Sequence, residues 1–102
     1  MAFAKVGLLS MLPPGSAMDA RVGDEAYAVC NLDGELFALS GTCPHAHGPI
    51  GQGMISGNFI VCPWHEYAFD CRTGANAYDP RLKLQTFAVK VDGDDILVDV
   101  RA

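Results

Sequence analysis

The stretch TFAVKVDGDDILVDV, residues 86–100, shows the fold class most directly. Apolar side chains at 87, 89 and 91 alternate with polar or smaller ones, and Ile96, Val98 and Val100 repeat the pattern after Asp92-Gly93. A period of two places each apolar set on one face of a strand. Asp-Gly between two such runs is a hairpin-turn signal, because glycine adopts positive φ at little cost. The stretch therefore predicts two paired antiparallel strands.

Similar signals occur along the rest of the chain. Asp33-Gly34 and Gly57-Asn58 mark two further hairpin turns. No segment has a convincing helical period, although residues 8–12 could form one short turn. The expected strands cover residues 3–7, 17–22, 25–32, 35–39, 59–61, 84–91 and 95–100. The pattern predicts an all-β protein.

Length and charge narrow the classes of function. The chain has 102 residues, 50% of them apolar, which is enough for one compact domain over residues 1–102. The net charge of -5 argues against nucleic acid as a partner, whose phosphates would repel the chain, and is compatible with docking on a basic patch of a protein. No apolar run approaches the roughly 20 residues that span a bilayer, and no targeting segment is recognisable. We therefore expect a soluble, cytoplasmic protein.

The segment 41–63 differs in composition from its surroundings. It is rich in glycine and proline, which a regular central strand does not tolerate, so it is expected to form loops standing out from the sheets. Two short pairs of potential metal ligands lie in or beside it, Cys43-Pro44-His45 and Cys62-Pro63-Trp64-His65. Each pair fits one tight loop, and a hairpin of residues 54–56 and 59–61 would bring the two loops together.

Two thiolates and two imidazoles suit either of two metal centres. One is a tetrahedral structural zinc ion, and the other is a [2Fe–2S] cluster with two cysteines on one iron and two histidines on the other. Zinc modules generally place two cysteines in one knuckle and two histidines in another. Here each loop supplies one cysteine and one histidine, which favours the two-iron centre because each loop can contribute to both irons.

These motifs resemble those of the Rieske [2Fe–2S] proteins. The resemblance covers nearly the whole chain and is carried by CPHAHGPI at 43–50, CPWHEYAFD at 62–70, and RTG at 72–74. It implies the Rieske fold, an antiparallel β-sandwich with a small cluster-binding subdomain over about residues 41–70, and one [2Fe–2S] cluster per chain. It also implies that Cys43 and Cys62 bind the inner iron, and that His45 and His65 bind the outer, solvent-facing iron.

The branch of the family follows from what the loops lack. High-potential respiratory members carry one more cysteine in each loop and join them in a disulfide, whereas the matching positions here are Gly48 and Trp64. The sequence instead resembles the small ferredoxins of aromatic-ring-hydroxylating dioxygenase systems. This implies a monomeric one-electron carrier, not itself an enzyme, whose transient partners are a flavin reductase and a terminal oxygenase. One departure is Glu66, where relatives often have glycine.

Two alternatives stay open at this point. The first is a Rieske-like small subunit of an assimilatory nitrite reductase, although many such relatives have lost ligands and all four are present here. The second is a structural zinc module, which would be colourless where an iron–sulfur protein is brown.

The remaining candidate residues have simpler interpretations. Cys30 alternates with apolar neighbours and is expected to be a buried hydrophobe, and Cys71 follows a strand with little to indicate a redox role. His47 is interpreted as a surface side chain near the cluster. Further expectations are an apolar rim of Pro49, Trp64 and Pro80 around the histidines, Tyr78 and Arg81 beside Pro80, and Asp19 and Glu35 at the end opposite the cluster.

Overall fold

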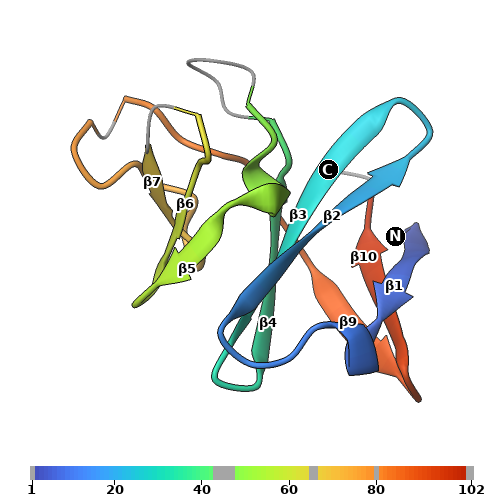
Figure 1. Ribbon diagram of the computed structural model, residues 1–102. Coiled ribbons are helices and arrows are strands. Elements are labelled where there is room, and N and C mark those ends of the chain that lie inside the picture. Colours follow the sequence, from blue (N-terminus) through green and yellow to red (C-terminus); the bar gives the residue numbers. More distant parts are fainter. Residues whose placement is uncertain (1, 43–47, 65–66, 80, 101–102) are drawn as a thin grey trace.

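Three antiparallel sheets make up the described part of the chain, residues 2–42, 48–64, 67–79 and 81–100 of a computed structural model (Figure 1). The sheets contain, in order, β1 (Phe3–Leu8), β10 (Asp95–Asp99) and β9 (Val89–Asp92); β2 (Ser16–Val22), β3 (Glu25–Leu32), β4 (Glu35–Ser40) and β8 (Thr86–Phe87); and β5 (Met54–Ser56), β6 (Phe59–Val61) and β7 (Ala68–Asp70). Two 3₁₀ turns, η1 (Leu9–Met11) and η2 (Ile50–Gln52), complete the described elements. The all-β prediction is confirmed.

The predicted hairpin turns lie where the sequence placed them. Between β3 and β4, Asp33 has φ of 56° and Gly34 has φ of 99°. Positive φ at both central residues matches the twist of the flanking strands, which fixes the register of the pair. Gly57 and Gly93 also adopt positive φ, 61° and 65°, at the β5–β6 and β9–β10 turns. The expected strands 25–32 and 59–61 coincide with β3 and β6.

The expected single strand 84–91 is wrong. The chain changes sheets at Ala88: Phe87 in β8 pairs with Ala38 of the middle sheet, whereas Val89 in β9 pairs with Val98 of the first sheet. The alternation continues through the break, so the hydrophobic period gives no sign of it. The expected strands did not include a range for β7, although Cys71 was expected to follow a strand, because three residues are too few to show a period.

Each face of the middle sheet covers a hydrophobic core, because β3 is buried on both sides. Tyr27 and Val29 point into a core shared with β9 and β10, where Ile96 and Val98 are fully buried. Ala28 and Cys30, on the alternate face, point into a second core shared with the third sheet. Figure 1 shows the three sheets as successive layers, with β3 and β4 in the middle.

The third sheet belongs to an excursion from the middle sheet. β4 and β8 are neighbours in that sheet, and Ser40 N donates a 2.9 Å hydrogen bond to Gln85 O where the chain leaves and returns. The described residues between 41 and 84 therefore leave the middle sheet and return to it at this hydrogen-bonded pair.

No helix in the described ranges is long or apolar enough to cross a membrane.

Candidate metal centre

The first predicted ligand loop is closed at its base by backbone pairing. Thr42 and Pro49 form an isolated antiparallel bridge, and Ile50 N donates a 3.0 Å hydrogen bond to Gly41 O. Ile50, the first residue of η2, is fully buried and anchors the return of the loop in the core. The segment 43–48 is thus spanned between two fixed points.

The second predicted ligand loop starts at the end of β6 and returns into β7. Its base is closed by Cys62 N, which donates a 2.7 Å hydrogen bond to Tyr67 O. β6 and β7 pair with each other, Val61 opposite Ala68, so the loop is a hairpin connection with a rigid stem. Such a stem fixes where residues 62–67 begin and end.

Of the four predicted ligands, the structure describes Cys62. Its side chain is fully buried at the end of β6, in the core between the middle and third sheets. Cys43, His45 and His65 lie outside the described residues, as do His47, Glu66 and Pro80. The described ranges alone contain no group of three or more metal-binding side chains.

Gly48 brings the two loops into contact and tests whether a cluster fits there. A Cβ atom built on Gly48 would lie 2.8 Å from Cys62 Sγ and 3.1 Å from Trp64 Cβ. Real Cβ atoms essentially never come that close to another heavy atom, so residue 48 lies against the Cys62 thiol only because it has no side chain. A buried thiol facing a glycine backbone, in a loop that also carries Cys43 and His45, suits a sulfur-ligated cluster.

The same contact has a further meaning. Gly48 and Trp64 are the two positions at which respiratory Rieske proteins carry their extra cysteines, and the structure places them side by side. In this chain, packing of Trp64 on Gly48 joins the loops instead of a disulfide. The sequence identified both positions but gave no sign that they touch.

The expected rim is partly described. Trp64 is 51% exposed, as expected for a side chain between two ligands, and Pro49 is half-buried. Tyr78 is 86% exposed on the loop 76–82. In that loop Arg81 Nε donates a 3.1 Å hydrogen bond to Asp79 Oδ1, and this bond holds the pKa of the Asp79 carboxyl below its ordinary value.

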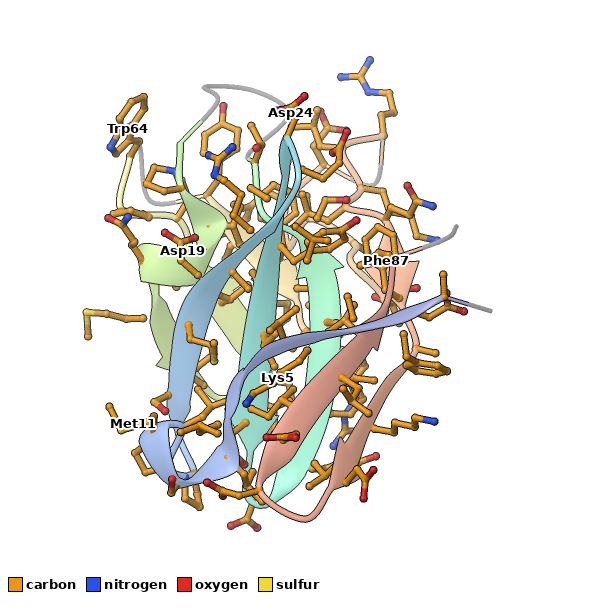
Figure 2. The ribbon with its side chains drawn as sticks, turned by 90° about the vertical axis from the view of Figure 1, so that its right-hand side faces the viewer. Lys5, Met11, Asp19, Asp24, Trp64 and Phe87 are labelled. Atoms are coloured by element: carbon orange, nitrogen blue, oxygen red, sulfur yellow. The ribbon has the colours of Figure 1, made fainter. Side chains whose placement is uncertain are left out.

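The expectation that Asp19 lies opposite the cluster is wrong. Asp19 Oδ2 accepts a 2.8 Å hydrogen bond from Gln52 Nε2, and Asp19 lines a pocket of about 330 Å³ together with Gly48 and Pro49. In the view of Figure 2, Asp19 lies on the side of Trp64, and Met11 lies toward the other end. Sequence alternation assigns a residue to a face of a strand, but does not reveal which loop packs on that face.

Cys30 and Cys71 are both fully buried in the core on the third-sheet side. The prediction that Cys30 is a buried hydrophobe is confirmed.

With this geometry in view, comparisons with known proteins are informative. Residues 2–95 match the family model of the Rieske [2Fe-2S] domain. The chain belongs to the Rieske [2Fe–2S] family. It is 39% identical to the ferredoxin component of biphenyl 2,3-dioxygenase from Rhodococcus jostii (strain RHA1), over 98% of this chain and 94% of that protein. Family membership decides between a zinc ion and a [2Fe–2S] cluster in favour of the cluster.

Solved Rieske structures agree with the fold. One is the complex of reduced oxygenase and oxidised ferredoxin in carbazole 1,9a-dioxygenase, in which the matching chain is 32% identical with a TM-score of 0.83, covering 94% of this chain and 91% of that one. A putative NADH-dependent nitrite reductase small subunit from Mycobacterium tuberculosis has a TM-score of 0.85 at 19% identity, covering 95% and 93%. That second likeness shows the fold alone. The Rieske domain described here, like its ferredoxin relatives, is a one-electron carrier and not itself an enzyme.

Proposed function

We propose that this protein passes single electrons from a flavin reductase to a terminal ring-hydroxylating oxygenase, as a cytoplasmic monomer. The observation that carries the proposal is the 39% identity, over 98% of the chain, with a ferredoxin component of a biphenyl dioxygenase. The structure of a similar ferredoxin in complex with its oxygenase supports a direct contact between carrier and oxygenase. An acidic carrier with a net charge of -5 suits a basic docking surface on either partner.

We assign the cluster ligands to Cys43, His45, Cys62 and His65, within a cluster-binding subdomain of about residues 41–70 in a single domain over 1–102. The support is the pair of loops closed at their bases, the buried Cys62 thiol at the end of β6, and the side-chain-free contact at Gly48. Cys43 and Cys62 are assigned to the inner iron, and His45 and His65 to the outer iron. When bound, the cluster supplies reversible uptake of one electron.

The chain's own residues set the conditions for that chemistry. Burial of Cys62 keeps water from the inner side of the site, and Trp64 covers the contact between the loops. Because Gly48 and Trp64 take the places of the respiratory disulfide, we expect a reduction potential near the low end of the Rieske range, on the order of -150 mV. Potentiometry checks this, and a value well above 0 mV would contradict it.

The proposed exit for electrons is the surface beside Trp64. Trp64 and its neighbour Pro63 are exposed, and they directly follow the proposed ligand Cys62. Small, transient apolar patches of this kind are typical of redox partners. Trp64→Ala is expected to slow electron delivery about tenfold, the loss of roughly 1.4 kcal/mol of docking free energy, while iron content stays unchanged.

The experiment is stopped-flow oxidation of the reduced protein by the oxygenase of the biphenyl 2,3-dioxygenase system. Glu35→Gln is the matched surface control, because Glu35 is exposed and follows the β3–β4 turn, at the lower end of Figure 1. Asp19 is unsuitable for this control, since it lines the pocket beside Gly48. Wild-type rates for Trp64→Ala together with a slow Glu35→Gln protein would place docking elsewhere.

A further inference from the structure

Two cysteines that the cluster does not use meet in the core. Cys30 lies in β3 of the middle sheet, and Cys71 directly follows β7 of the third sheet. Both side chains are fully buried in the same core, and a side-chain hydrogen bond joins the two thiols. Within the described residues neither is part of a disulfide. They form a dithiol that bridges two sheets.

The pair is separate from the proposed metal centre. Cys71 N donates a 2.9 Å hydrogen bond to Asn58 O, at the start of β6, whereas Cys62 follows the other end of that strand. The two sulfur sites therefore lie at opposite ends of β6.

One of the two cysteines lies in the wall of a surface pocket. A pocket of about 430 Å³ is lined by Cys71 and Arg72, which follow β7, by residues of β4, β8 and β9, among them Phe37, and by Ala88 between β8 and β9. The Arg72 guanidinium carbon lies 5.9 Å above the centre of the Phe37 ring, on the wall of this pocket. Cys71 itself has no exposed area, so a reagent in the pocket reaches its sulfur only when the pocket wall moves.

Reactivity is divided between the two thiols. The hydrogen bond from Cys30 favours the thiolate form of Cys71 and lowers its pKa, and the same bond together with burial raises the pKa of Cys30. Thiolates, not thiols, attack oxidants. Cys71, which lines the pocket, is the attacking sulfur, and Cys30, which does not, is the resolving one.

We propose that Cys30 and Cys71 form a peroxide-oxidisable dithiol, reached through this pocket, whose disulfide ties the middle sheet to the cluster-bearing sheet. In the first step the Cys71 thiolate attacks one oxygen of hydrogen peroxide and the O–O bond breaks. The leaving hydroxide takes up a proton and becomes water, and Cys71 becomes a sulfenic acid. In the second step the Cys30 sulfur attacks the Cys71 sulfur and releases a second water. Two thiols and one peroxide give one disulfide and two waters.

The test treats the cluster-loaded protein with hydrogen peroxide, removes excess peroxide with catalase, and unfolds the chain in iodoacetamide. The sequence suits mapping with a protease that cleaves before aspartate. Peptides 24–32 and 70–78 then carry Cys30 and Cys71 singly, and 33–69 carries both Cys43 and Cys62. The expected product is 24–32 linked to 70–78, lighter by two hydrogens than the free pair and separated by a reductant, with the visible spectrum of the cluster retained.

Two variants sharpen the result. In Cys30→Ser no resolving thiol remains, so the Cys71 sulfenic acid should persist and be trapped by dimedone. In Ala88→Leu the thiols are untouched but the mouth of the pocket is filled, so cross-linking should slow several-fold. In the wild-type protein the disulfide should raise the thermal unfolding midpoint by about 10 °C or more, because it closes a long loop.

Three results would overturn the proposal. One is loss of the cluster spectrum with no 24–32/70–78 link in the wild-type protein. This outcome does not depend on whether any variant folds. Another is a cross-link that contains Cys43 or Cys62. An unchanged rate in folded Ala88→Leu would overturn the pocket as the route.

Discussion

The two cores on the faces of the middle sheet are built in different ways. Toward β9 and β10, large side chains from regular strands interlock: Ile96 and Val98 are fully buried, and the Tyr27 and Phe87 rings meet edge to face with centroids 5.0 Å apart. Toward β5–β7, the strands have three residues each, and three of the buried side chains are cysteines. We call the first the frame core and the second the cluster-side core.

The cluster-side core depends on close approach of the backbone. A Cβ on Gly51 would lie 2.6 Å from Asp19 Cα, and one on Gly53 would collide with the Val61 carbonyl oxygen. By contrast, Gly34 and Gly93, in the turns next to the frame core, have open space around them. On the frame-core side a Cβ on Gly7 would meet the flexible end of the Met18 side chain, whereas Gly51 and Gly53 meet backbone atoms. The frame core is thus specified mainly by the pattern of side chains, and the cluster-side core also by close backbone contacts that only glycine permits.

The largest expected effect separates the sulfurs of the cluster-side core by role. Cys62→Ser should abolish the cluster, because serine does not replace the thiolate that binds the inner iron. Iron and acid-labile sulfide should then fall from two of each per chain to none. Cys30→Ser, equally buried, should keep its iron. Iron and sulfide analysis of both proteins checks this, and a zinc-loaded, colourless wild-type protein would contradict the assignment.

The next prediction compares one buried isoleucine from each core. Ile60→Ala and Ile96→Ala each remove a fully buried side chain, and each should lower the free energy of unfolding by roughly 2–5 kcal/mol. Only Ile60 lies in β6, which leads into Cys62, so only Ile60→Ala should also speed the release of iron to a chelator. Denaturant titration and chelator kinetics measure the two effects. Equal iron release from both variants would mean that the cores act as one.

A pair of glycines provides a smaller contrast. Gly48→Ala places a methyl group against Cys62 Sγ and should lower the iron content about twofold or more. Gly34→Ala meets no atom, but its φ of 99° disfavours a side chain, so the protein should lose about 1 kcal/mol of stability with its iron intact. Visible absorbance per chain and thermal unfolding distinguish them. Full occupancy in Gly48→Ala would show that the loop relaxes away from the thiol.

The smallest effect concerns pH and the loop 76–82. The Asp79 pKa is lowered from its ordinary value of 3.8, mainly by the Arg81 side chain. The stabilisation of the loop by this pairing is therefore complete above that value and is lost as pH falls through the lower, folded-state pKa. Exchange of the Arg81 amide, which donates to Asp79 Oδ1, should therefore gain protection above the lowered pKa in the wild type but not in Asp79→Asn. Identical profiles for the two proteins between pH 3 and 7 would rule out this link.

The sheets that enclose the frame core were the more predictable part of the fold. Alternation and the Asp33-Gly34 turn placed β3 with the bounds it has, because a strand buried on one or both faces shows its period in a single run of residues. The break at Ala88 could not be predicted, since what changes there is the partner strand and not the period. The range of the three-residue β7 was not predicted, because so short a strand shows no period.

For the site, ligand spacing predicted the chemistry, and contacts between distant segments were missed. The Cys62 loop and the β5–β6 hairpin that leads into it were expected from residues a few positions apart. The Gly48–Trp64 contact, the Asp19–Gln52 hydrogen bond and the Cys30–Cys71 pair each join residues far apart in sequence. No local pattern marks such pairs, because the packing of three sheets creates them.

The clamp between Ser40 and Gln85 has a consequence for chain length. To the frame, the segment 41–84 is a single loop whose ends are held at one hydrogen-bonded pair. The entropy of closing a loop grows only with the logarithm of its length, so that doubling it costs about 0.6 kcal/mol. Residues inserted at the exposed β5–β6 turn, where Gly57 meets no neighbouring atom, should therefore lower the stability of the sheets around the frame core very little. This turn is the place to attach a probe or a tether.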